Sequence, residues 1–138
     1  MTQTVLGFDT SGGWCAAAVT RNGAVLAHHH MILPRGQGET LMPLLEAVLR
    51  EAGVEWHDLT AIGVGIGPGN FTGIRISVAA ARGLAMALGI PAVGVTLLEA
   101  LAHGATGPTL SALDARRGHV YLQAFDDGVA RGSPEMRP

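Results

Sequence analysis

The chain has 138 residues and a net charge of −2, with 48% apolar and only 14% charged residues. This length allows one modest domain and excludes two full-sized ones. The negative charge excludes binding of nucleic acid by the chain's overall electrostatics, so any RNA contact must come from a local cluster or a partner. A small domain this apolar is expected to keep apolar surface after its core is filled, which favours a partner surface.

Neither a disulfide nor a membrane segment is expected. Cys15 is the only cysteine, which excludes an intrachain disulfide and a cysteine zinc site. The longest apolar run, Ile74 to Ile90, is interrupted by Arg75, Arg82 and glycines, so we expect no membrane span. Met1 to Val5 has neither the charged nor the long apolar segment of a signal peptide. These features predict a cytoplasmic protein without membrane contact.

The first part of the chain predicts three strands. Val5 to Phe8 is an apolar run that ends in a polar, glycine-rich turn, Asp9-Thr10-Ser11-Gly12-Gly13. Trp14 to Thr20 and Ala24 to Ile32 follow as strands. Asn22-Gly23 between them is the strongest short-range signal of a β-hairpin.

Two helices with unusually wide apolar surfaces are predicted next. The first is ended by Gly53 and carries two apolar rows, which comprise Leu41, Met42, Leu44, Leu45, Val48, Leu49 and Ala52. The second runs from about Phe71 to Leu88 after the apolar strand Ala61 to Ile66, with Asn70 or Thr72 as its cap. It is apolar nearly all round, which is typical of a helix buried on both sides.

In so short a chain, we expect a second protein to cover part of these two helices; burial within the chain is the alternative. The predicted partner interface comprises Leu41, Leu45, Val48, Leu49, Gly73, Ile74, Arg75, Ser77, Val78, Ala81 and Arg82. The row of Gly73, Ser77 and Ala81 permits close helix contact. Replacing Ala81 by glutamate is expected to abolish dimer formation and leave the monomer folded.

The remaining elements complete an α/β fold. Ala92 to Val95 predicts a strand, Thr96 caps a short helix that extends to His103, and a hairpin follows. The order β-β-β-α-β-α-β-α predicts a mixed five-stranded sheet, and apolar runs such as Ile62-Val64-Ile66 are typical of strands covered on both faces. We expect a first lobe over residues 1–105, and the start of a second lobe with a frayed tail over residues 106–138. We find no internal repeat.

Few residues predict chemistry. Asp9, Thr10 and Ser11 form either a half-site for a hydrated metal and a phosphate or a polar turn that bonds its own backbone. Gly67-Pro68-Gly69 either binds an anion at the helix start or permits a tight turn that lets Gly73 approach another backbone. Three consecutive histidines in one strand alternate faces and cannot share a metal. No serine has an evident base, so we expect no catalytic residue and no metal site.

Three segments together resemble the TsaB family: Phe8-Asp9-Thr10-Ser11, the ten residues Gly67 to Ile76, and Leu113-Asp114-Ala115-Arg116. The middle motif is specific, and the match covers about Thr4 to Phe125. The resemblance implies an actin/Hsp70/sugar-kinase-like (ribonuclease H-like) lobe. It also implies a non-catalytic dimerisation subunit of the complex that forms threonylcarbamoyladenosine in tRNA.

The resemblance further implies the partners. These are a TsaD-like transferase that carries the metal and a TsaE-like ATPase, with a homodimer formed when TsaD is absent. The tRNA is reached through the complex, where ATP or ADP and Mg belong. The catalytic relative needs a His-x-x-x-His pair, and Thr96 to Ala100 has neither imidazole. Family members look longer, with a second lobe that begins near Thr109.

Two enzymatic functions are alternatives. One is an ATP- and Mg-dependent phosphotransferase of the actin-like kinase class, with Asp9 as the magnesium anchor. The other is a peptidase, because the wider family is also described as glycoprotease-like. Outside these hypotheses, Arg116 and Arg117 either contact RNA or form a solvated turn.

Overall fold

The computed structural model describes all residues from Met1 to Pro138 and divides them into two compact units, Met1–Gly94 and Val95–Pro138. We expected the division after residue 105. It falls earlier because the short helix α3 (Leu97–Ala102) packs on strands that follow it in the chain. Its buried Leu98 and Ala102 share a small core with Phe125.

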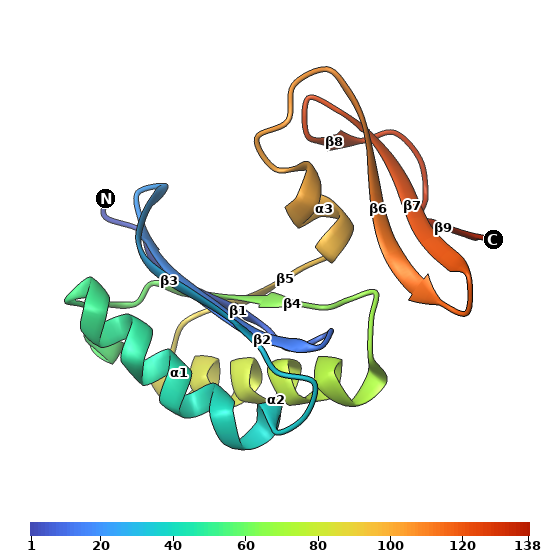
Figure 1. Ribbon diagram of the computed structural model, residues 1–138. Coiled ribbons are helices and arrows are strands. Elements are labelled where there is room, and N and C mark those ends of the chain that lie inside the picture. The colour runs from blue at the N-terminus through green and yellow to red at the C-terminus, as the bar shows by residue number, and fades with distance from the viewer. The chain divides into compact units, whose positions relative to one another are not determined.

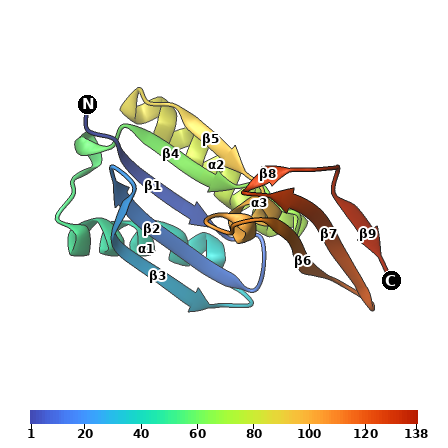
Figure 2. The same cartoon turned by 90° about the horizontal axis from the view of Figure 1, so that it is seen from above.

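The first unit is a mixed five-stranded sheet with two long helices, as predicted. Figure 2 shows the strands side by side in the order β3-β2-β1-β4-β5. They are β1 (Thr4–Asp9), β2 (Trp14–Arg21), β3 (Ala24–Ile32), β4 (Ala61–Gly65) and β5 (Ala92–Val95). β1 pairs antiparallel with β2 and parallel with β4. The helices are α1 (Gln37–Ala52), a short 3-10 helix η1 (Trp56–Asp58) and α2 (Phe71–Leu88).

Within this unit, α1 and α2 lie on the same face of the sheet (Figure 1). Alternate side chains of the central strands point to this face and are buried: Thr4, Leu6, Phe8, Cys15, Ala17, Val19, Ile62 and Val64. The residues between them, such as Val5 and Ala61, are only half-buried. The expectation of strands covered by helices on both faces was therefore wrong for this unit. The strands follow the period of two that belongs to a sheet with one covered face.

α1 uses almost its whole apolar arc inside the chain. Leu41, Leu44, Leu45, Val48 and Leu49 are all buried. The segment after the helix folds back and adds Val54 and Leu59 to the same core. Most of the second apolar row is therefore covered without a partner, and Met42 alone in it is exposed. The prediction that Leu41, Leu45, Val48 and Leu49 contact a partner is therefore wrong.

α2 approaches β1 through its row of small residues, Gly73, Ser77 and Ala81, which are buried. The Thr10 hydroxyl donates a hydrogen bond to the Gly73 carbonyl at 2.6 Å and lies 2.5 Å from the Ser77 hydroxyl. A Cβ on Gly73 would collide with the Thr10 carbonyl oxygen. The predicted close approach of Gly73 to another backbone is confirmed. The same burial shows that these three residues lie inside the first unit and do not face a partner.

By length and composition alone, α2 is the one helix that could cross a membrane, although we expected none. It qualifies because its 18 residues include only two charged ones, Arg75 and Arg82. This is weak evidence, since core helices of globular proteins meet the same criterion. The inner row of α2 packs against the sheet, as the core helix of a globular domain does.

The second unit places α3 against a sheet built on one long hairpin. The hairpin strands are β6 (Pro108–Arg116) and β7 (His119–Asp126), and β8 (Val129–Ala130) and β9 (Glu135–Arg137) both pair with β7. The expectation of a frayed tail was therefore wrong. The Gln123 side chain donates to the Gly132 carbonyl at 2.9 Å, and Arg131 N donates to the Ala124 carbonyl at 2.9 Å, which holds the tail along the hairpin.

Two glycines of α2 provide a matched test of the contact with β1. Gly73→Ala is expected to lower the free energy of unfolding by about 1–3 kcal/mol, because the new methyl group overlaps the Thr10 carbonyl. Gly83→Ala, where nothing lies within 4 Å, is expected to raise it by roughly 0.5–1 kcal/mol, because alanine favours the helix. Urea denaturation measures both changes. A Gly73→Ala variant as stable as Gly83→Ala would contradict the close contact.

Candidate functional site

The end of β1 and the start of α2 meet in a cluster of polar groups, which we call the β1–α2 junction (Asp9–Gly13 and Gly67–Gly73). Asn70 N donates to the Ser11 carbonyl at 2.6 Å, and Asn70 Oδ1 accepts from Gly73 N at 3.1 Å. Of the two predicted caps, Asn70 is the one used. A Cβ on Gly69 would collide with Ser11, so the glycine-rich loop serves a tight approach of two backbones.

Asp9 is held by the residues that follow it. Its Oδ2 atom accepts from Trp14 Nε1 at 2.7 Å, from Ser11 Oγ at 2.8 Å and from Ser11 N at 3.2 Å. Its Oδ1 atom is buried without a partner, beside Gly65, where a Cβ would not fit. Burial, and next the charge of Asp9, raises the pKa of the Cys15 thiol, so this cysteine is not activated as a nucleophile. The bonds of Asp9 are those of a polar turn, with one carboxylate oxygen left over.

The residues of the junction do not fit a magnesium–nucleotide site by themselves. Mg²⁺ requires near-octahedral oxygen coordination, usually from one or two carboxylates, water and phosphate. The junction offers one carboxylate oxygen, and no group of three His, Cys, Asp or Glu residues is placed to hold a metal. The hydroxyls of Thr10 and Ser11 are bonded to Gly73 and Asp9. We therefore derive no chemical step through a metal or nucleotide on this chain.

The predicted histidines and serines form no catalytic set. His29 lies 2.8 Å from Glu51, and His30 lies beside Trp14 with ring centroids 6.0 Å apart, so neighbouring imidazoles have different surroundings. The hydroxyls of the three candidate serines are bonded to Asp9, Thr10 and the Leu98 carbonyl, and none has an imidazole partner (Ser11, Ser77, Ser111). This arrangement gives no support to a serine peptidase.

The outward side of α2 is exposed and includes two of the residues predicted to contact a partner, Arg75 and Arg82. Phe71, Arg75, Ala79, Arg82 and Met86 lie along one line of the helix, which we call the α2 outer row. Phe71 is 72% exposed and Met86 is 85% exposed. The Arg75 guanidinium lies 5.2 Å from the centre of the Phe71 ring, a cation–π contact.

Only part of the α2 outer row was predicted from the sequence. Of the predicted residues, Arg75 and Arg82 belong to it, and the half-buried Ile74 and Val78 flank it. These four stay a prediction. Phe71, Ala79 and Met86 were not predicted. The prediction placed the partner on the side of α2 that carries the small residues, and these three lie on the opposite side. The signal was available, since the three lie opposite Gly73, Ser77 and Ala81 at helical spacing.

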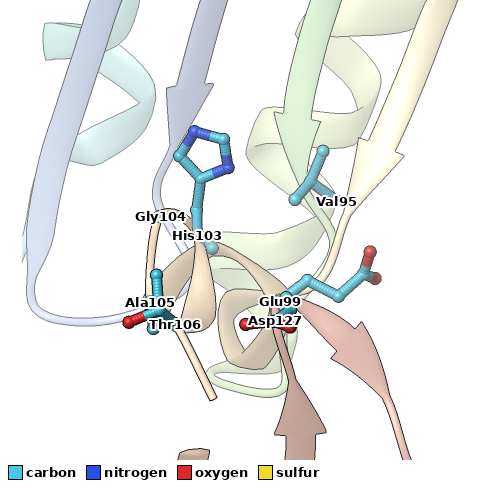
Figure 3. A pocket seen from close by; sticks show the side chains of 9 residues that line it. Val95, Glu99, His103, Gly104, Ala105, Thr106 and Asp127 are labelled. Atoms are coloured by element: carbon cyan, nitrogen blue, oxygen red, sulfur yellow. The ribbon is translucent and has the colours of Figure 1, made fainter.

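The second unit contains an open pocket of about 760 Å³, lined by Val95, Glu99, Ala100, His103, Gly104, Ala105, Thr106, Asp127 and Gly128 (Figure 3). The imidazole of His103 and the carboxylate of Glu99 point in different directions. Glu99 takes part in a capping box with Thr96, and Asp127 Oδ1 accepts from Gly107 N at 2.6 Å. Its two carboxylates thus support local backbone, and the pocket presents no catalytic constellation.

The chain is similar to known proteins over most of its length. Residues 31–132 match the family model described as TsaD, tRNA N6-adenosine threonylcarbamoyltransferase. The tRNA threonylcarbamoyladenosine biosynthesis protein TsaB of Escherichia coli (strain K12) is 36% identical over 93% of this chain and 58% of that protein. The protein of the same name from Bacillus subtilis (strain 168) is 37% identical over 92% of this chain and 58% of that protein.

Solved structures are also similar to this chain. YeaZ from Pseudomonas aeruginosa is 35% identical, with a TM-score of 0.85 over 99% of this chain and 68% of that chain. A ROK hexokinase from Thermus thermophilus, 22% identical with a TM-score of 0.55 over 95% of this chain and 48% of that chain, shows the actin/Hsp70/sugar-kinase-like fold alone. The chain spans 58% of the length of the two TsaB relatives. The family match, the TsaB relatives and the YeaZ structure agree with one another, and the chain belongs to the TsaB family.

Proposed function

We propose that this chain is a non-catalytic interaction subunit in the biosynthesis of threonylcarbamoyladenosine in tRNA, and that it docks through the α2 outer row. The observation that carries the proposal is the exposure of Phe71 and Met86 on a helix that buries only Gly73, Ser77 and Ala81. Fully burying one large apolar side chain is worth about 1.5–3 kcal/mol. A partner that covers the row therefore gains binding energy by burying Phe71 at one end of the row and Met86 at the other.

The row also indicates the chemistry of its partner. Phe71 and Met86 require an apolar surface, while Arg75 and Arg82 require carboxylates or carbonyl groups between the two apolar ends. A TsaD-like transferase subunit is the proposed partner in the complex, and a second copy of this chain takes its place in a homodimer. A TsaE-like ATPase and tRNA complete the assembly, which works in the cytoplasm. The names of the relatives and the TsaD family match support this pathway.

The β1–α2 junction supports a structural role for the motif that carries the family resemblance. Its glycines allow two backbones to approach, and its hydroxyls and amide bond to neighbouring groups of the same chain. These bonds position the first two turns of α2, in which Phe71 and Arg75 lie. The motif thus presents the proposed docking surface.

Ala79→Glu tests the docking surface, because Ala79 is an exposed member of the α2 outer row. A carboxylate placed in a desolvated interface is expected to weaken dimer formation and capture of a TsaD-like subunit by roughly 100-fold. Sedimentation velocity measures the dimer. Ala81→Glu is unsuitable, contrary to our expectation, because Ala81 is 1% exposed and glutamate there would disrupt the core.

Ala100→Glu is the matched control, since Ala100 is an exposed alanine on a different helix, α3. It is expected to leave association unchanged. Both variants should show the circular dichroism spectrum of the parent chain. Equal association of Ala79→Glu and the parent would refute docking through this row.

The phosphotransferase alternative has one observation in its favour, the unpartnered Oδ1 atom of Asp9. Because no second carboxylate or free hydroxyl stands beside it, we expect calorimetry with Mg-ATP to show no binding in the micromolar range. Asp9→Asn keeps the shape of the side chain and removes its charge. A micromolar dissociation constant that this variant abolishes would favour the kinase over the interaction subunit.

A further inference from the structure

Two exposed arginines occupy a backbone conformation that long side chains disfavour, at the tip of the β6–β7 hairpin. β6 ends at Arg116, with φ 64°, and Arg117 and Gly118 form the turn, with φ 53° and 74°. A positive φ disfavours a residue with a side chain, because its Cβ then comes too close to the following carbonyl oxygen. Residues with strained backbone conformations cluster at functional sites, and these two are exposed and charged.

The other two hairpin turns of two residues use residues that suit the same geometry. Asn22-Gly23 joins β2 to β3 with φ 50° and 84°, and Asp127-Gly128 joins β7 to β8 with φ 49° and 79°. Asparagine and aspartate tolerate positive φ, and Asn-Gly and Asp-Gly are the preferred pairs in such turns. At the β6–β7 turn, Arg117 takes the place of Asn22 and Asp127. Arg116 adds a second positive φ at a bulge, where glycine is usual.

Neither guanidinium forms an ion pair, although one carboxylate, that of Asp114, lies at the turn. Asp114 Oδ1 accepts the Arg116 backbone N–H at 2.8 Å, and Glu135 pairs with Arg137 at 2.7 Å. None of the ion pairs of the chain involves the guanidinium of Arg116 or Arg117. Asp126 and Asp127 stand at the opposite end of the hairpin, roughly 25–30 Å away at about 3.3 Å per residue. The tip is thus a small cationic point on a chain of net charge −2.

We propose that this tip contacts the sugar-phosphate backbone of tRNA, an inference that rests on the proposed function. Guanidinium groups match the geometry of phosphate oxygens, and two adjacent ones can engage successive phosphates. Such contacts position an RNA without selecting its sequence. Strain at Arg116 and Arg117 is then the cost of keeping cations where asparagine and glycine would give a more stable turn.

The test compares two double variants of the full chain, R116N/R117N and R50N/R131N. Both remove two exposed arginines, but Arg50 lies on α1 and Arg131 lies after β8. Fluorescence anisotropy measures binding of a labelled, unmodified tRNA transcript between 50 and 200 mM salt. For R116N/R117N we expect a dissociation constant roughly 10- to 30-fold higher near 0.15 M salt, and a salt dependence smaller by about 2 phosphate contacts. Its melting temperature should stay the same or rise, because asparagine suits a positive φ.

Several outcomes would overturn the inference. They are absence of tRNA binding by the parent chain, equal weakening by both double variants, and a fall in the melting temperature of R116N/R117N that indicates a structural role. Competition by polyglutamate as strong as by unlabelled tRNA at equal charge would indicate an acidic protein instead. Ala79→Glu in the same assay separates the two proposals, since it is expected to lose the dimer while its monomer still binds tRNA through the tip.

Discussion

The contact between α2 and the end of β1 determines which side chains of α2 are buried and which are exposed on the surface of the first unit. At this contact the Thr10 hydroxyl lies 2.6 Å from the Gly73 carbonyl and 2.5 Å from the Ser77 hydroxyl, with no room for a side chain at position 73. Because the side of α2 that comes this close must carry small residues, large side chains are placed on its flanks, where Ile76, Leu84 and Leu88 pack against the core, and on its outward side. The exposure of Phe71 and Met86 therefore follows from how the helix is packed.

Most secondary structure could be predicted because local signals agreed with one another. The apolar strand runs, the Asn22-Gly23 turn and the Asn70 cap each act within a few residues, and the structure confirms them. The alternation of buried and half-buried strand residues was not predicted. What covers a helix is decided by distant parts of the chain. The width of the apolar arc of α1 was visible in the sequence, but its covering by Val54 and Leu59 depends on a segment that folds back. The pairing of β8 and β9 with β7 likewise depends on hydrogen bonds between distant residues, which no local sequence pattern predicts.

The candidate site was predictable to the level of residue type but not of bonding. Asp9 had two open interpretations, and the distinction came from Trp14, whose indole N–H occupies the carboxylate from the far side of the turn. Trp14 was predicted only as the start of a strand. Nothing in the spacing of the two residues distinguishes an indole that bonds Asp9 from one that merely packs on the sheet.

The β1–β2 hairpin of the first unit and the β6–β7 hairpin of the second share a layout that was not predicted from the sequence. Thr4, Asp9 and Gly13 in the first correspond in spacing to Thr109, Asp114 and Gly118 in the second. In both, the aspartate accepts the backbone N–H two residues later. The first turn is clamped by α2, so its residues are confined to small and polar types. The second turn is exposed, so the side chains of Arg116 and Arg117 extend into solvent and displace no core residue.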